Sequence, residues 1–93
     1  MDKEHAETIA LQALAFIAKD DELLAQFLSL SGLAPQELKS RFRDPDFLGG
    51  VLDMILGDDT VLLAFCNTVS LSPDTLVRAR RILPGGQNTY DGE

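Results

Sequence analysis

The sequence predicts an all-α protein: a compact six-helix bundle built from two pseudo-symmetric three-helix repeats. Apolar residues recur three or four positions apart almost throughout, which is the spacing of one helix face. No stretch alternates apolar and polar residues between turn signals, as a β-hairpin does. DDELLAQF at residues 20–27 returns as DDTVLLAF at residues 58–65. The 93 residues, 45% of them hydrophobic, suit a single helical domain, which we expect at 1–84.

The first half of the chain is expected to hold three helices, the first from Lys3 to Ala18. Asp20 opens the second, because a carboxylate there accepts hydrogen bonds from free backbone N–H groups, and Gly32 ends it. Pro35 opens a short third helix, since the first helical position needs no N–H. The buried side of the second helix is expected to carry Leu23, Leu24, Phe27, Leu28 and Leu30.

The second half shows the same start and stop signals. Asp44, followed by proline, opens a fourth helix that ends at Gly57. Asp58 opens a fifth helix, and Ser72, again followed by proline, opens a sixth. Residues 85–93 have no apolar periodicity, so we expect a flexible C-terminal tail there.

A shift of 38 positions aligns residues 9–42 with 47–80 without a gap and yields nine identities over 34 positions. The identities fall on helix caps and apolar positions. Three short helices bury little surface alone, so the two copies are expected to cover each other's apolar faces in one core. The identical pairs are Leu14/Leu52, Ile17/Ile55, Asp20/Asp58, Asp21/Asp59, Leu24/Leu62, Phe27/Phe65, Leu33/Leu71, Pro35/Pro73 and Leu38/Leu76.

The two copies differ at a pair of glycines. Gly49 and Gly50 occupy the positions of Leu11 and Gln12. Each glycine costs about 1 kcal/mol inside a helix relative to alanine, so another interaction must offset this cost. A close approach of two helices is the simpler interpretation, and a pocket for a small ligand is the alternative.

The charges are unevenly distributed. The formal net charge of −7 opposes generic binding to nucleic acid or to an anionic membrane. Six of the eight cations nevertheless lie in or just after the third helix of each copy. Three interpretations are open: they complement a helix dipole, they bind an acidic partner, or they contact nucleic acid. These six residues are Lys39, Arg41, Arg43, Arg78, Arg80 and Arg81.

The residue types that perform catalysis are sparse. Cys66 is the sole cysteine and has apolar neighbours, so we expect a buried thiol rather than a nucleophile or a zinc ligand. His5, the sole histidine, lies near the N-terminus without a serine or cysteine motif. The paired aspartates stand where helix caps are required. We therefore expect no enzyme activity, no metal and no cofactor. The longest early apolar run is ten residues, so we expect a cytoplasmic protein with no membrane span.

Three stretches resemble a known family: ETIALQALAFIAKDDELLAQFL at 7–28, GLAPQEL at 32–38 and DPDFLGGVLDMILGDDTVLLAF at 44–65. They resemble domain of unknown function family 3572, a group of short bacterial proteins, over residues 6–83. DPDFLGGVLD is the most specific block. The resemblance implies a small all-helical protein and carries over no catalytic or binding residue.

Three functional hypotheses follow. The favoured one is a non-enzymatic module that binds another protein or forms a homodimer through Leu11, Phe16 and the glycine pair. The second is a nucleic-acid-associated regulator that uses the six clustered cations. The third is a small-ligand binder, or an unrecognised enzyme, near Gly49 and Gly50.

Overall fold

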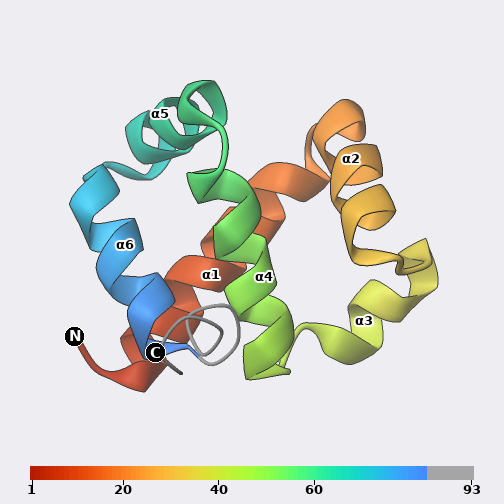
Figure 1. Cartoon of the computed structure of the whole chain (residues 1–93), viewed down its shortest axis with the longest axis horizontal. Helices are drawn as coiled ribbons and strands as arrows, with labels where there is room; N and C mark the ends of the chain where they lie inside the picture. Colours follow the sequence, from red (N-terminus) through yellow and green to blue (C-terminus); the bar gives the residue numbers. More distant parts are fainter. Residues whose placement is uncertain (84–93) are drawn as a thin grey trace, which may run out of the picture.

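Helix caps define the architecture of this chain. The computed structural model describes residues 1–83, and all regular structure in that part is helical (Figure 1). The predicted tail at 85–93 lies outside the described residues. The elements are α1 (Lys3–Ala18), α2 (Asp21–Ser31), a 3₁₀ turn η1 (Pro35–Glu37) that leads into α3 (Leu38–Arg41), α4 (Pro45–Leu56), α5 (Asp59–Val69) and α6 (Pro73–Ile82).

Polar side chains begin the five long helices, and those that begin α2, α4, α5 and α6 are the ones that the sequence predicts. Asp20 accepts hydrogen bonds from two backbone N–H groups of α2, at 2.9 and 3.2 Å. Asp58 does the same at the start of α5, at 3.0 and 3.3 Å. Asp2, Asp44 and Ser72 each accept one such bond at the starts of α1, α4 and α6. Each cap satisfies N–H groups that the helix itself leaves without a partner.

The ends of α2 and α5 adopt the same backbone conformation. Gly32 closes α2 with φ of 74°, where glycine lacks the steric penalty of a side chain. Ser70, 38 positions later, closes α5 with φ of 58° and is the sole non-glycine residue among those described with positive φ. Both positions turn the chain sharply toward the next element.

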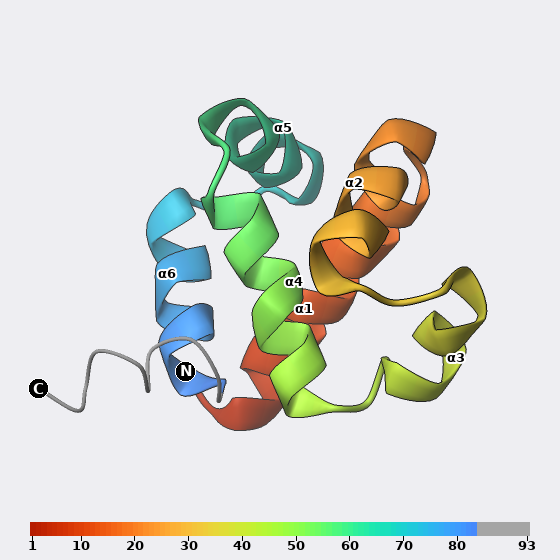
Figure 2. The ribbon, with the colours of Figure 1, turned by 45° about the vertical axis from the view of Figure 1, so that its right-hand side comes forward.

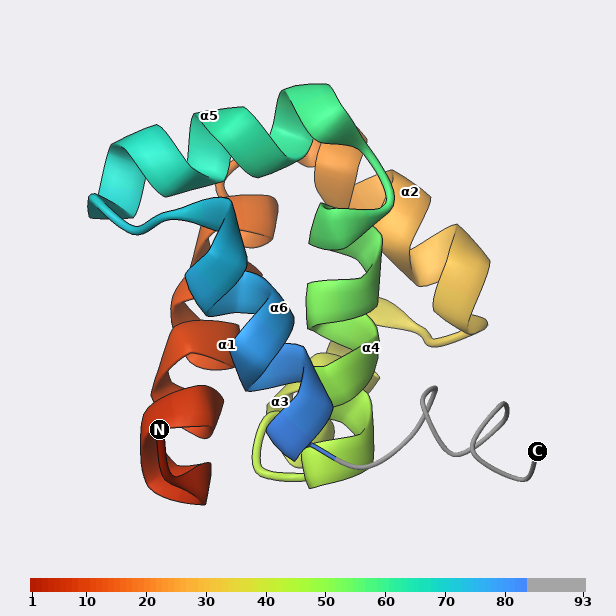
Figure 3. The same cartoon turned by 60° about the vertical axis from the view of Figure 1, so that its left-hand side comes forward.

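The core lies where α1, α4 and α6 meet. α4 packs across α1, and α6 contacts both (Figures 1 and 2). α5 lies across the ends of these three helices, while α2 packs against α1 and α4 (Figure 3). The Cα radius of gyration is 12.4 Å, close to the about 12 Å expected of a compact domain of this length. The largest fully buried side chains are Ile9, Ile17, Leu48, Val51, Leu52, Ile55, Phe65, Leu76 and Leu83.

Two aromatic pairs attach the outer helices to the central pair. Phe65 of α5 meets Phe16 of α1 edge to face, with ring centroids 5.4 Å apart. Phe27 of α2 meets Phe47 of α4 in the same way at 5.5 Å. Such pairs add about 0.5–1.5 kcal/mol beyond the burial of their area.

The third elements of the two halves differ. α6 is ten residues long and buries Leu76 and Ala79 completely, whereas η1 and α3 form one short, half-exposed segment. Arg41 occupies the position in α3 that Ala79 occupies in α6. A guanidinium at that position opposes burial in an apolar core, so α3 stays at the edge of the molecule (Figure 2).

One predicted core residue is in fact on the surface. Leu30 is 73% exposed, because no element covers the last turn of α2 on that side. The helix lengths also bear on membranes. In the described part of the chain no single helix is long and apolar enough to cross one; α5 and α6 reach the required length only together, with a bend of 99°.

Candidate functional site

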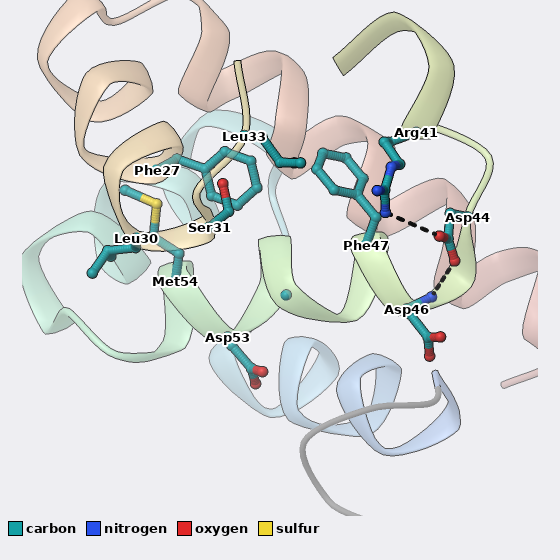
Figure 4. A pocket seen from close by; sticks show the side chains of 11 residues that line it. Phe27, Leu30, Ser31, Leu33, Arg41, Asp44, Asp46, Phe47, Asp53 and Met54 are labelled. Atoms are coloured by element: carbon teal, nitrogen blue, oxygen red, sulfur yellow. Dashed lines mark hydrogen bonds and ion pairs between the residues drawn. The ribbon is translucent and has the colours of Figure 1, made fainter. Parts of the chain in front are cut away.

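A hollow with a mainly apolar lining lies between α2 and α4. Phe27 of α2 and Phe47 of α4 pack edge to face within its lining and form its floor (Figure 4). The hollow has a volume of about 540 Å³. Its apolar lining comes from the last turn of α2, the loop after it and one side of α4, through Phe27, Leu30, Leu33, Phe47 and Met54.

A second hollow continues the first toward the start of α5. It has a volume of about 240 Å³ and shares Leu30, Asp53 and Met54 with the first. Together they form one depression along α4, here called the α2–α4 trough. It runs from Asp44 to Asp58, which at 1.5 Å per helical residue is about 20 Å.

Gly50 lies at the middle of the trough. A Cβ built on Gly50 meets no atom within 4 Å, so no neighbouring helix requires a glycine there. Gly49, in contrast, is buried within the core face of α4. The close-approach interpretation therefore fails at Gly50. The missing side chain instead leaves the trough open at its centre.

One edge of the trough is acidic. Asp46, Gly50 and Asp53 follow the i, i+4, i+7 spacing that places them along one side of α4. Asp44 and Asp58 stand at the two ends, and Arg41 is the one cation in the lining. Four aspartates stand against Arg41 in the lining and Arg80, which binds Asp53, so this surface keeps a negative charge.

The aspartates differ in their partners. Asp44 lies 3.8 Å from the Arg41 guanidinium and caps α4, and Asp58 caps α5. Asp53 accepts two hydrogen bonds from Arg80. The Asp46 carboxylate has no ion-pair partner within residues 1–83, so it is the carboxylate most available to a ligand.

The six clustered cations do not share one surface. Arg80, one of the six residues of the possible interaction surface, is 7% exposed and bound to Asp53, so it does not belong to such a surface. Arg41 and Arg78 are exposed next to Asp44 and Asp74, at 3.8 and 3.3 Å. α3 and α6, which carry the cations, lie on opposite sides of α4 (Figures 1 and 2).

The remaining cations are exposed side chains near the helix ends. Lys39 lies in α3, and Arg81 lies in the last turn of α6. The Arg43 guanidinium lies 5.3 Å from the centroid of the Phe42 ring. Lys39 and Arg81 lie in the last turns of their helices, where a cation interacts favourably with the negative end of the helix dipole.

The predicted α1 surface is small. Leu11 is 39% exposed, but Phe16 is half-buried and packs on Phe65. Leu63 on α5, at 56%, is more exposed than Leu11, and Leu30 in the trough is the most exposed large apolar side chain among those described.

Cys66 and His5 both lie outside the trough. Burial raises the pKa of the Cys66 thiol, which keeps it protonated at neutral pH. His5 is exposed in the first turn of α1 and donates its backbone N–H to Asp2. No three His, Cys, Asp or Glu side chains of residues 1–83 converge as a metal site would require.

The sequence does not mark two of the trough residues, Leu30 and Met54, as site residues. Leu30 was assigned to the core, and Met54 was not singled out. The one signal in the sequence was Gly50, whose alternative interpretation was a pocket. The i, i+7 spacing of Asp46 and Asp53 around Gly50 was a second available signal.

Comparisons with known proteins place the chain in a family without a known activity. A family model described as "Protein of unknown function (DUF3572)" matches residues 3–86. No curated protein and no solved structure matches the chain.

Proposed function

The chain belongs to the DUF3572 family of proteins of unknown function, and we propose that it is a non-enzymatic interaction module whose α2–α4 trough holds an amphipathic helix of a partner protein. The trough itself is the observation that carries this proposal. It combines an apolar floor, an open centre at Gly50 and an exposed apolar side chain, Leu30, at its rim. A concave apolar surface of this kind is a usual protein-binding site.

A helix suits the trough better than an extended strand. All regular structure in residues 1–83 is helical, so the described part offers no sheet edge to which a strand could add. The trough is about 20 Å long, which accommodates about 13 residues of helix. An apolar stripe at i, i+3, i+4 and i+7 on such a helix matches a floor built from two helices.

Leu30 and Met54 are the expected energetic centre of the contact. Leu30 is 73% exposed and Met54 is half-buried, and they face the trough from opposite helices (Figure 4). Complete burial of a leucine or methionine contributes about 1.5–3 kcal/mol. Methionine also adapts its shape to a partner, because its side chain is unbranched.

The proposal that the protein is no enzyme rests on the state of its potential nucleophile and base. Cys66 is buried with a raised pKa, so the reactive thiolate is disfavoured. His5 lies in the first turn of α1 and is not among the residues that line the trough. The trough lining contains carboxylates, one guanidinium and the Ser31 hydroxyl, which donates to the Leu28 carbonyl oxygen of its own helix and to no base.

Site-specific photo-crosslinking in the native cell tests the proposal. A photoreactive amino acid replaces Leu30 in one variant and Leu63 in a matched control, since Leu63 is exposed on α5 outside the trough. We expect position 30, and not position 63, to crosslink to a helical segment of another protein. Crosslinks at both positions, to a second copy of this chain alone, or none at position 30 contradict the proposal.

We also propose that the two halves are copies of one unit related by an approximate two-fold axis. α1 and α4 pack against each other, α2 packs on α1 and α4, and α5 packs on α4 and α1, which is the arrangement such an axis requires. A hollow of about 520 Å³ lies between α2 and α5. Its lining includes three pairs of residues 38 positions apart: Glu22/Thr60, Leu23/Val61 and Gln26/Ala64.

The proposed duplication gives the trough a counterpart between α5 and α1, a hollow of about 440 Å³. The hollow between α5 and α1 is lined by Gln12 and Phe16, where the trough has Gly50 and Met54. Gln12, an exposed side chain, stands at the position that Gly50 leaves without one. The two copies have thus diverged at the position that determines access to the floor.

A further inference from the structure

We propose that the helix held in the α2–α4 trough is cationic, with lysine or arginine residues beside its apolar stripe. This inference rests on the proposed function and adds the chemistry of the partner. Asp44, Asp46, Asp53 and Asp58 line the trough, against Arg41 alone. An interface of this charge favours a partner of opposite charge and speeds its association.

The acidic edge has a defined geometry. Asp46 and Asp53 lie seven residues apart on α4, which separates their Cα atoms by about 10 Å along the helix. Gly50 lies between them without a side chain, so a partner helix can approach the α4 backbone there. Cations seven residues apart on the partner, flanking its apolar stripe, match this spacing.

Arg80 holds the Asp53 carboxylate in place. Its guanidinium, buried behind α4, donates to both carboxylate oxygens, at 2.6 and 3.2 Å. The Asp53 side chain remains 53% exposed, so it still contributes to the negative edge. Asp46 carries no such partner within the described residues and is the preferred contact for a partner cation.

The same charges disfavour the other occupants. Phosphates of nucleic acid or of an anionic membrane are repelled by the acidic edge. A second copy of this chain carries a net charge of −7. Its most basic helix, α6, buries its apolar residues Leu76 and Ala79 in its own core, so it has no free apolar stripe to insert.

Three synthetic peptides test the inference on the full chain. Each has about 14 residues and the same leucine stripe, with lysine, glutamine or glutamate at all other positions. Isothermal titration at low salt should give a dissociation constant about tenfold lower for the Leu/Lys peptide than for the Leu/Gln peptide, and no binding of the Leu/Glu peptide. The advantage of the lysine peptide should decrease as added salt screens the charges.

Two variants of equal charge locate the interaction. Asp46→Asn removes a carboxylate from the trough, and Asp59→Asn removes one from the first turn of α5, outside it. The Leu/Lys peptide should bind Asp46→Asn about threefold more weakly and Asp59→Asn with unchanged affinity. Equal losses in both variants would mean a generic attraction to an acidic protein and would overturn the inference.

The peptide series separates failure of this inference from failure of the proposed function. If the Leu/Lys and Leu/Gln peptides bind with equal affinity, and Leu30→Asp abolishes the binding of both, the trough binds apolar helices without a preference for cations. That result would overturn this inference and leave the proposed function standing. No binding of any peptide, or binding that Leu30→Asp does not weaken, would overturn both.

Discussion

The Arg80 guanidinium binds the Asp53 carboxylate through two hydrogen bonds, from Nε to Oδ1 at 2.6 Å and from Nη2 to Oδ2 at 3.2 Å. A third bond, from Nη1 to the Leu83 carbonyl oxygen at 3.0 Å, closes the C-terminal end of α6. One buried side chain therefore connects α6 to α4 and to the acidic edge of the trough. Such bidentate contacts between arginine and a carboxylate combine charge with fixed geometry.

Removal of the Asp53 carboxylate should destabilise the protein. In Asp53→Ala, the buried guanidinium loses its carboxylate partner and two hydrogen bonds, at an expected cost of about 1–3 kcal/mol. Urea denaturation followed by circular dichroism measures this change. Asp46→Ala, on the same side of α4 and without an ion pair, is the control and should change the free energy of unfolding by less than about 0.5 kcal/mol. Equal effects of the two substitutions would show that the Arg80 contact contributes nothing.

The two double caps should have matching energies. Asp20→Ala and Asp58→Ala each remove a carboxylate that accepts two backbone N–H groups, so each should lower the free energy of unfolding by about 1 kcal/mol. Denaturant titration of the two variants compares them. Asp21→Ala, one residue after the first cap, should cost less. A large effect at one cap and none at the other would argue against equivalent roles for α2 and α5.

Gly50 should oppose stability while it favours binding. Gly50→Ala adds a methyl group that meets no atom within 4 Å, so it should raise the free energy of unfolding by about 1 kcal/mol. The same methyl group intrudes on the trough and should weaken the Leu/Lys peptide. Thermal unfolding and titration measure the two effects.

The control for Gly50→Ala is Asn67→Ala, an exposed position on α5 outside the trough. It should stabilise the protein slightly through helix propensity and leave peptide affinity unchanged. If Gly50→Ala stabilises the protein with no loss of affinity, the open centre has no role in binding.

Cys66 should be unreactive in the folded protein. Its pKa is raised above the ordinary value of 9.0 by burial, so both access and thiolate fraction are low at neutral pH. A thiol reagent should label it quickly in urea and slowly in native buffer. Because the folded state holds the proton more tightly, stability should fall as the pH rises above about 9. Cys66→Ala should remove that part of the decline; an unchanged decline would exclude the thiol as its cause.

The sequence predicted the helices because their boundaries depend on local chemistry. Asp20, Asp58 and Ser72 cap helices where their side chains reach free N–H groups, and Gly32 ends one where a positive φ is needed. These interactions span two to four residues and are visible in the chain itself. The difference in length and burial between α3 and α6 was harder to predict, since it depends on one aligned position, where α3 has Arg41 and α6 has Ala79.

The trough was harder to predict because it exists where no neighbouring element covers the apolar residues of α2. Leu30 continues the apolar stripe of Phe27, and periodicity alone places it in the core. Its exposure follows from the path of α3, which leaves the last turn of α2 uncovered. Arg80 is the opposite case, because the sequence suggests an exposed cation and the structure buries it. Its carboxylate partner is 27 residues away, on another helix, so composition suggested a surface cation.

The most direct test of the account is where a helix binds. Amide chemical shifts of the ¹⁵N-labelled chain, recorded during titration with the Leu/Lys peptide, report this position residue by residue. We expect the largest changes at Leu30, Gly50 and Met54, with little change at Leu11 and Leu63. Changes centred on Leu11 or Leu63, or none at Gly50, would contradict a binding site between α2 and α4.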